Sequence, residues 1–238
     1  MARKHILGRS GTGKSWYLGW YIEQVLPEFE YGFHFDVENE EAGLCENPYS
    51  YLKNFPVDKE ILDDWPIPAV LEANKKVRVV PDGLTKNERI KLFEIVADTA
   101  LKICENNDVN LHISGDEAHL YLGRHNIEER SSRLLTAGRK KGLEWCFATQ
   151  RGQNLNEEVL GQSNWGIYFQ LRDRDKTKIK GAVDFPIHRI DELQTREAIR
   201  ENFDSGDVTK IDTETLSRET THHAGDDGVA DKILQRGK

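Results

Sequence analysis

The stretch that decides the fold stands almost at the amino terminus and reads Gly8-Arg9-Ser10-Gly11-Thr12-Gly13-Lys14-Ser15. It matches the Walker A pattern, G-x-x-x-x-G-K-[ST], at every defined position. Glycines let consecutive backbone N–H groups turn toward an anion without a Cβ in the way, and a helix that follows points its positive end at the same place. The stretch therefore predicts a loop that holds the phosphates of a nucleoside triphosphate.

Two side chains of this loop have expected roles. Lys14 is expected to reach the β- and γ-phosphates, and the Ser15 hydroxyl is expected to bind a Mg2+ ion. The flanking sequence supports the motif, because a short apolar run predicts a strand over 4–7 and helical spacing predicts a helix over 13–26, which Pro27 ends. ATP and Mg2+ are thus the expected ligands.

Length and composition favour one α/β domain. The chain has 238 residues, a net charge of −8 and no change of composition before its polar end. We expect a single domain over 1–212 and a flexible tail over 213–238. No apolar run approaches a membrane span, and the first strand starts too early to leave room for a signal peptide, so neither a transmembrane segment nor secretion is expected. The net charge argues mildly against a nucleic-acid coat, but it leaves room for a local basic lining.

A second informative stretch is the apolar run from Val109 to Gly115, which ends in Asp116-Glu117. A strand followed by two acids is the Walker B arrangement. Asp116 is expected to hold Mg2+ through water, and Glu117 to take a proton from the water that attacks the γ-phosphate. The letters from Asp116 to His119 also spell a helicase box, but helicases of that group carry two such domains and this chain is too short.

Two further strands end in polar residues. The strand predicted over 143–150 ends in Gln150, whose amide can bond both the attacking water and the γ-phosphate if the strand lies between the Walker A and Walker B strands. The alternative is an amide that caps a turn. The strand predicted over 31–36 ends in Asp36, which is either close to the ligand or a solvated turn acid.

The rest of the chain alternates between helical and extended patterns. The segment 38–68 is irregular and is expected to form loops and short helices over one sheet edge. Thr85 and Glu88 predict a capping box at the start of a long helix. The remaining predicted elements are strands over 77–80, 165–171 and 208–211, and helices over 85–106, 127–141, 156–160 and 189–199.

A run of basic residues follows the strand at 165–171, and its cations are Arg172, Arg174, Lys176, Lys178 and Lys180. In a ring-shaped assembly such a run can line the pore and contact the phosphates of nucleic acid. The alternative, to which we give equal weight, is the charged and solvated start of a helix.

These motifs, in this order, resemble those of the FtsK–HerA superfamily of DNA-pumping P-loop ATPases. The resemblance covers about residues 4–180. It rests on the Walker A loop, on the strand that ends in Gly115-Asp116-Glu117-Ala118-His119, and on the turn Gly138-Arg139-Lys140-Lys141-Gly142 ahead of Ala148-Thr149-Gln150-Arg151. Because large flanking domains are missing, the chain is most similar to the genome-packaging ATPases of tailless, internal-membrane viruses of bacteria and archaea. The fold implied is a RecA-like P-loop NTPase with a central, mostly parallel sheet flanked by helices.

The resemblance also implies a function. It implies an ATPase that forms a homo-oligomeric ring, as a hexamer, and moves double-stranded DNA into a preformed capsid. It implies a location in the host cytoplasm or the virion, a partner at the capsid vertex or in the membrane, and an arginine finger for the neighbour's γ-phosphate, for which Arg133 and Arg139 are the candidates. Two alternatives stay open: a small-molecule kinase with an arginine-rich lid over 124–139, and a related ATPase for plasmid transfer or export.

Overall fold

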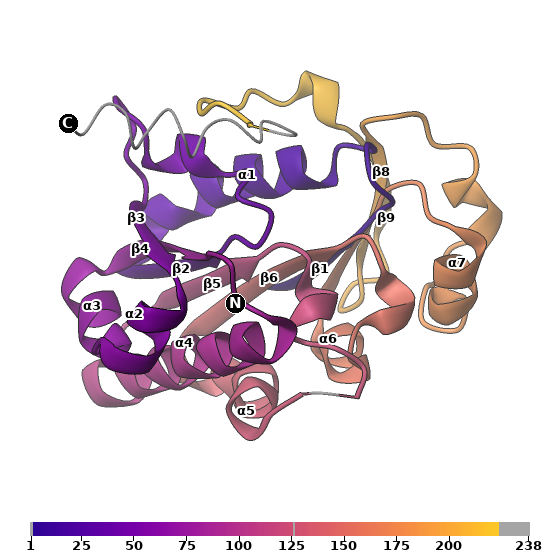
Figure 1. Cartoon of the computed structure of the whole chain (residues 1–238). Coiled ribbons are helices and arrows are strands. Elements are labelled where there is room, and N and C mark those ends of the chain that lie inside the picture. Colours follow the sequence, from indigo (N-terminus) through magenta and orange to yellow (C-terminus); the bar gives the residue numbers. More distant parts are fainter. Residues whose placement is uncertain (1, 126, 224–238) are drawn as a thin grey trace.

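The computed structural model describes residues 2–125 and 127–223 and contains one nine-stranded sheet (Figure 1). The strands are β1 (Arg3–Leu7), β2 (Tyr31–Phe35), β3 (Lys53–Val57), β4 (Lys76–Pro81), β5 (Leu111–Gly115), β6 (Leu143–Thr149), β7 (Trp165–Tyr168), β8 (Glu197–Asn202) and β9 (Val208–Asp212). The α-helices are α1 (Lys14–Val25), α2 (Lys59–Asp64), α3 (Ile67–Asn74), α4 (Lys86–Asn107), α5 (Glu129–Ala137), α6 (Glu157–Gln162) and α7 (Asp173–Ile179).

The sheet is mostly parallel, and its strand order is β3-β4-β2-β5-β6-β1-β7-β8-β9. All pairs from β3 to β7 are parallel, whereas β8 and β9 are joined to that core as antiparallel strands. Strand β6, which ends next to Gln150, lies between β1 and β5, as the sequence analysis requires for Gln150 to stand beside both Walker motifs. The predicted fold class, a P-loop NTPase with a central parallel sheet, is confirmed.

Helices cover both faces of the sheet, so the central strands are apolar on both sides. In Figure 1, α1 lies above the sheet, and α2 to α6 lie below it. Neighbouring strand residues point to opposite faces: Ile6 packs in the cluster beneath α1, while Leu7 belongs to the cluster on the α4 side. Strand β6 divides in the same way, with Ala148 toward α1 and Phe147 toward α4.

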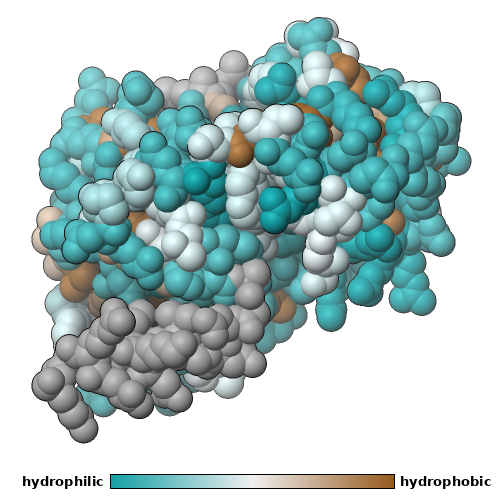
Figure 2. Space-filling model, turned by 90° about the horizontal axis from the view of Figure 1, so that it is seen from above, coloured by the Kyte–Doolittle hydropathy of each residue, from teal (hydrophilic) through white to brown (hydrophobic). Residues whose placement is uncertain are grey.

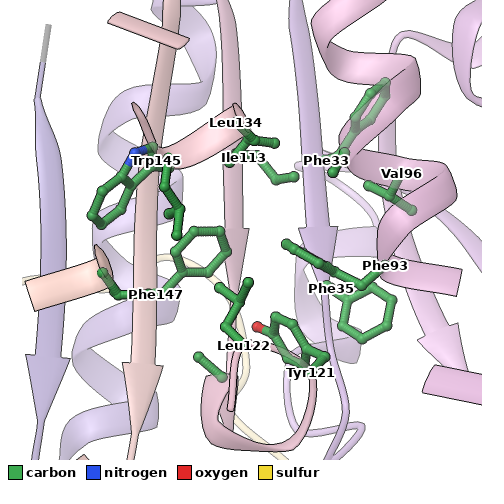
Figure 3. Close-up of a cluster of buried hydrophobic side chains, with 14 of the residues drawn as sticks. Phe33, Phe35, Phe93, Val96, Ile113, Tyr121, Leu122, Leu134, Trp145 and Phe147 are labelled. Carbon is green, nitrogen blue, oxygen red and sulfur yellow. The ribbon is translucent and has the colours of Figure 1, made fainter. Parts of the chain in front are cut away.

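The larger of the two clusters is built around aromatic rings (Figure 3). The Phe93 ring of α4 meets the rings of Phe35 and Tyr121 with centroids 5.3 and 4.4 Å apart, and Phe147 of β6 lies 5.8 Å from Phe93. Phe35 ends β2 and Tyr121 follows the Walker B acids, so this packing fixes two of the loops that form the carboxyl edge of the sheet. Burial of rings of this size is the main source of stability in such a core.

Most predicted elements are present, and their ends differ by a few residues. The capping box of α4 is confirmed, because the Thr85 hydroxyl accepts the Glu88 N–H and the Glu88 carboxylate accepts the Thr85 N–H. The predicted helix over 127–141 is shorter and ends in a 3-10 turn (Gly138–Lys141), and the predicted strand over 165–171 ends at Tyr168.

Two segments have a secondary structure that differs from the prediction. The helix predicted over 189–199 is a 3-10 turn (Ile187–Ile190) followed by β8, because pairing with β7 and β9 overrides a weak local helix preference. The segment 38–68, predicted to be loops and short helices, also contains β3, which holds Pro56. A proline is tolerated there because β3 is an edge strand.

The segment after residue 212 is predicted by the sequence to be a flexible tail. Its described part, 213–223, instead contacts the domain above α1, and Arg218 in it is buried against Glu23 and Glu41. The Glu23 carboxylate also accepts the N–H groups of Glu219 and Thr220 at 2.8 Å. The rest of the predicted tail, 224–238, lies outside the described residues.

The surface seen from above is mainly hydrophilic, with small and separate hydrophobic patches (Figure 2). This agrees with a charged fraction of 31% in the sequence. Among the residues that the structure describes, no helix combines the length and the apolar character that crossing a bilayer requires.

Candidate nucleotide-binding site

The Walker A loop follows β1 at the carboxyl edge of the parallel strands and ends where α1 begins, at Lys14. Gly11 and Gly13 have φ values of +78° and +100°, a region that side chains with a Cβ rarely adopt. Two hydrogen bonds fix the loop. Within it, the Thr12 hydroxyl donates to the Arg9 carbonyl at 2.8 Å, and the Arg9 N–H donates to the carbonyl of Gln170, which follows β7, at 2.9 Å. The result is a preformed loop at the positive end of α1.

The predicted catalytic side chains converge on this loop. Lys14 Nζ lies 3.2 Å from Glu117 Oε1, and both residues are about 5% exposed or less. The second oxygen, Glu117 Oε2, accepts the backbone N–H of Gln150 at 3.3 Å. The structure therefore brings the P-loop lysine, the predicted base and the predicted sensor residue into one chain of contacts.

Glu117 is buried and has an unfavourable backbone conformation. Its φ is +40°, in the left-handed region, and such strained backbone is concentrated at functional sites. Burial alone would raise the pKa of Glu117, but the bond from His119, the charge of Lys14 and the Gln150 N–H outweigh burial and hold the pKa below its ordinary value. The carboxylate is therefore ionised at neutral pH, which a proton acceptor requires.

His119 contacts the predicted base, and the sequence analysis assigns it no role. Its Nδ1 lies 2.8 Å from the hydroxyl of Thr149 and 3.1 Å from Glu117 Oε2. The histidine thus positions the glutamate against the end of β6. The signal in the sequence is the letter pattern from Asp116 to His119, which by itself indicates only a helicase box.

Asp116 lies behind the cavity. Its two carboxylate oxygens accept the N–H groups of Val37 and Glu38 at 2.5 and 3.1 Å. Burial and the nearby charge of Asp36 raise the pKa of Asp116 well above its ordinary value. The bonds to the loop after β2 show how Asp116 ties the Walker B strand to its neighbour.

Asp36 is a buried acid, so the interpretation as a solvated turn acid is wrong. It is fully buried, and its carboxylate accepts the Arg78 Nε–H at 2.6 Å and the N–H groups of Glu40 and Glu41 at 3.2 and 2.9 Å. Arg78 is buried as well and also bonds Asn54 at 2.7 Å. This network fixes the loop that approaches the Walker A cavity from the β2 side.

The cavity over the Walker A loop has a volume of about 500 Å³. Residues from both sides of β1 line it, among them Arg9, Ser10, Gly11, Gly13, Lys14, Ser15, Trp16, Glu38, Glu40, Glu117, Gln150, Thr195, Arg196 and His222. Glu38, Trp16 and Arg196 are missed by the sequence analysis, because they lie in stretches without a motif. Desolvation and the negative charges of Glu117 and Glu40 raise the pKa of Glu38.

The donor set at the cavity fits Mg2+, which the Walker pattern implies. Ser15 and Glu38 line the cavity, whereas Asp116 lies behind it, where each of its oxygens accepts one N–H and keeps a second lone pair. Hydroxyl and carboxylate oxygens are the ligands that Mg2+ prefers. Within residues 2–125 and 127–223, no group of three or more His, Cys, Asp and Glu is placed to hold a metal ion.

The arginine-finger candidates lie elsewhere. The Arg133 guanidinium pairs with Glu105 at 2.5 Å, beside Asn110 and Gly142, which precede β5 and β6. Arg133 is therefore at the amino edge of the sheet, the opposite edge from the Walker A loop. The backbone of Arg139 lies in the 3-10 turn Gly138–Lys141, and its side chain is outside the described set.

The basic run forms α7, and its cations differ in their surroundings. Lys176 pairs with Asp173 and Asp191, and Lys178 pairs with Glu157. Arg172, Arg174 and Lys180 are exposed, and the two arginines line a cavity of about 480 Å³ together with Gln150 and Arg151.

Strand order and the Walker A loop together define a P-loop NTPase fold. No family model matches the sequence, and no curated protein matches it. Among solved structures, the chain is similar to the genome-packaging NTPase B204 of Sulfolobus turreted icosahedral virus 2 in complex with ATP-gammaS, with 21% identity, a TM-score of 0.65, and coverage of 88% of this chain and 96% of that one.

Two further solved structures show the same fold. B204 of Sulfolobus turreted icosahedral virus, described as a DNA-packaging ATPase, is 20% identical with a TM-score of 0.64 over 88% of this chain and 96% of that one. VirB4 of Thermoanaerobacter pseudethanolicus is 9% identical with a TM-score of 0.62 over 91% and 89%. At these identities the likeness establishes the fold, and the predicted resemblance is confirmed at that level.

Proposed function

We propose that this protein is an ATPase motor that moves double-stranded DNA, and that it packages a viral genome into a preformed capsid as a homo-oligomeric ring. The observation that carries the proposal is the chain of contacts from Lys14 through Glu117 to the Gln150 backbone. A P-loop lysine, an ionised carboxylate and a sensor residue in contact are what hydrolysis of a γ-phosphate needs.

The side chains have defined tasks in this hypothesis. Backbone N–H groups of the loop and Lys14 bind the phosphates of ATP, and Lys14 then leaves Glu117. Glu117, oriented by His119, accepts the proton of the attacking water. Ser15 and Asp116 would hold Mg2+, which neutralises phosphate charge when it is bound. A trans arginine, Arg133 or Arg139, would complete the site of the neighbouring subunit.

Hydrogen bonds on two sides of the nucleotide site support the transmission of nucleotide state to α7. The Gln150 N–H bonds Glu117, and three residues further along the chain the Gln153 N–H donates to Asp175 at 2.9 Å. Asp175 is a buried residue of α7. From the other side, the Arg9 guanidinium of the Walker A loop bonds the Gln170 side chain at 2.6 Å, just before α7.

The exposed cations at the start of α7 are the proposed DNA contacts. Arg172, Arg174 and Lys180 are exposed and form no ion pair within the described part of the chain, whereas Lys176 and Lys178 pair with acids of this chain. We therefore assign DNA binding to the first three, although the sequence proposes all five cations. Location in the host cytoplasm or the virion, and a partner at the capsid vertex or in the membrane, belong to the same proposal.

The kinase alternative loses support from the placement of its lid. Of the arginines between 124 and 139, Arg130 pairs with Asp98 and Arg133 pairs with Glu105, both on α4, so these two side chains do not cover the phosphates. A lid arginine of a kinase would contact the transferred phosphate instead.

Steady-state ATPase activity tests the proposal. Wild type and Glu117→Gln are compared with and without double-stranded DNA at two salt concentrations, and the oligomeric state is recorded at each protein concentration. We expect DNA to stimulate hydrolysis and salt to weaken that stimulation. In Glu117→Gln the stimulation by DNA should be absent. An activity that ignores DNA in the oligomer contradicts the DNA motor, and ADP release that requires a nucleoside acceptor supports the kinase.

A further inference from the structure

Arg196 lies against the Walker A loop in a strained backbone conformation. Its φ is +69°, a conformation that is unfavourable for a non-glycine residue and persists only where the surroundings fix it. Here the Arg196 N–H donates to the Thr12 carbonyl at 2.9 Å, and the Arg196 carbonyl accepts the N–H and hydroxyl of Thr213 at 2.9 and 2.8 Å. The residue is thus held between the loop and the carboxyl-terminal segment.

The side chain of Arg196 runs along the first turn of α1. Its stem packs against Gly13, since a Cβ at Gly13 would come within 3.3 Å of Arg196 Cγ. Its guanidinium carbon lies 5.6 Å from the ring centroid of Trp16. Within the described part of the chain, no carboxylate forms an ion pair with Arg196, although Arg78 and Arg218 each have such partners. A planar cation and an indole therefore lie close together at the rim of the Walker A cavity.

Strand order shows which end of the nucleotide this rim faces. Glu117 follows β5 and Gln150 follows β6, and both strands lie on one side of β1. Arg196 precedes β8, which lies on the other side of β1. The hydrolytic groups fix the γ-phosphate on the β5–β6 side, so the nucleoside leaves the loop toward β8.

We propose that Trp16 and Arg196 form the subsite for the nucleoside, with the planar base stacked on the indole–guanidinium pair. This proposal rests on the proposed binding of ATP at the Walker A loop. Arginine and tryptophan are suited to this role, because both offer a flat face on which a planar base can stack.

The test compares ATP with inorganic tripolyphosphate, which has the phosphate chain but no nucleoside. Binding of both is measured by calorimetry for wild type, Arg196→Ala and Arg200→Ala. Arg200 is a matched control, because it is an exposed arginine of β8 that lies 5.2 Å from the Trp165 ring and is absent from the lining of the cavity. We expect Arg196→Ala to weaken ATP about 3- to 30-fold and to leave tripolyphosphate unchanged, and Arg200→Ala to change neither.

Other results overturn the subsite. If Arg196→Ala weakens the binding of ATP and of tripolyphosphate equally, Arg196 is a phosphate ligand. If ATP binding is unchanged, Arg196 has no role in nucleotide binding. Arg196→Gly, which relaxes the positive φ, must reproduce the alanine result, and its melting temperature shows whether the fold is retained. Failure of the proposed function gives a different result from failure of the subsite. The wild type would then bind neither ATP nor tripolyphosphate, and Lys14→Ala would not change the binding of either.

Discussion

An ion pair lies at each of the two edges of the parallel sheet, and the two pairs differ in how far they are buried. At the carboxyl edge, Lys14 and Glu117 form an ion pair whose side chains are 6% and 5% exposed, and Glu117 is strained at positive φ. At the amino edge, Arg133 and Glu105 pair at 2.5 Å with side chains that are 42% and 27% exposed. Burial of charge is costly, so a protein retains it where chemistry needs it. The difference therefore favours the carboxyl edge as the place of the hydrolytic chemistry within one subunit, whereas the pair at the amino edge is solvated.

The largest expected effect is on the rate of ATP hydrolysis, when one carboxylate oxygen of Glu117 at the carboxyl edge is replaced by an amide nitrogen. Glu117→Gln keeps the shape of the side chain but removes the base, so the hydrolysis rate should fall by about 10²- to 10⁴-fold while ATP binding is retained. Glu105→Gln, the same change at the amino edge, should leave the rate within about twofold of wild type, because its carboxylate belongs to a solvated surface pair. Single-turnover hydrolysis and equilibrium binding measure the two quantities. Comparable losses for both variants would show that the contrast between the edges has no functional meaning.

The Walker motifs and the parallel sheet can be predicted because their signals are local. A glycine pattern, an apolar run and a terminal acid are contiguous in the sequence, and these patterns predict Lys14 and Glu117 as site residues, which the structure places in contact. Arg196 and Glu38 cannot be predicted in this way, since each reaches the cavity through pairings between distant strands. The strand β8 is missed for the same reason: only its partners β7 and β9 make it extended.

The basic run shows a different limit. From the sequence, all five cations are equally good candidates for DNA contacts. The acids that pair with Lys176 and Lys178 are Asp191 and Glu157, which are distant from them in the sequence. Spacing cannot reveal such pairs. Likewise, the acidic Asp36 cannot be separated from a solvated turn acid until its partner Arg78 is located on β4.

The second largest effect concerns stability. Arg78→Met leaves the fully buried Asp36 without its cation and should lower the free energy of unfolding by about 3–5 kcal/mol. Arg133→Met, at the exposed pair, should give an unfolding curve indistinguishable from wild type. Urea denaturation at pH 7 measures both. Adding Asp36→Asn to Arg78→Met should recover part of the loss, and a larger loss in the double variant would refute the ion-pair explanation.

A smaller, pH-dependent effect is expected from a residue in the interior between the edges. Burial lowers the pKa of His112 in β5 to about 3, and among the residues that the structure describes neither ring nitrogen has a hydrogen-bond partner. The unfolded chain therefore binds a proton below about pH 6.5 that the folded chain does not, so stability falls as pH falls from about 6.5 toward 3, by up to about 1.4 kcal/mol per pH unit.

Urea denaturation at pH 7, 6 and 5 tests this dependence on wild type and His112→Phe. The variant keeps a ring beside Tyr21 and Phe29 and should lose part of the pH slope. His5, whose pKa burial also lowers to about 3, should retain its share. The control is His188→Gln, at a position that is 70% exposed, and it should keep the wild-type slope. An unchanged slope in His112→Phe would mean that another group causes the loss in acid.

The smallest effect uses α4, which runs from one edge of the sheet to the other. It begins at the carboxyl edge with the Thr85 cap, and it ends at the amino edge with Asp108 at a φ of +51°. Thr85→Ala removes the acceptor of the Glu88 N–H and should cost about 1 kcal/mol, whereas Asp108→Gly relieves a left-handed residue and should be neutral or slightly stabilising. Neither position lines the Walker A cavity, so ATP hydrolysis should stay at the wild-type rate in both variants. Thermal unfolding with a parallel ATPase assay separates the cases, since a rate that follows the change at Thr85 would mean that the carboxyl edge responds to the stability of α4 as well as to its own buried charges.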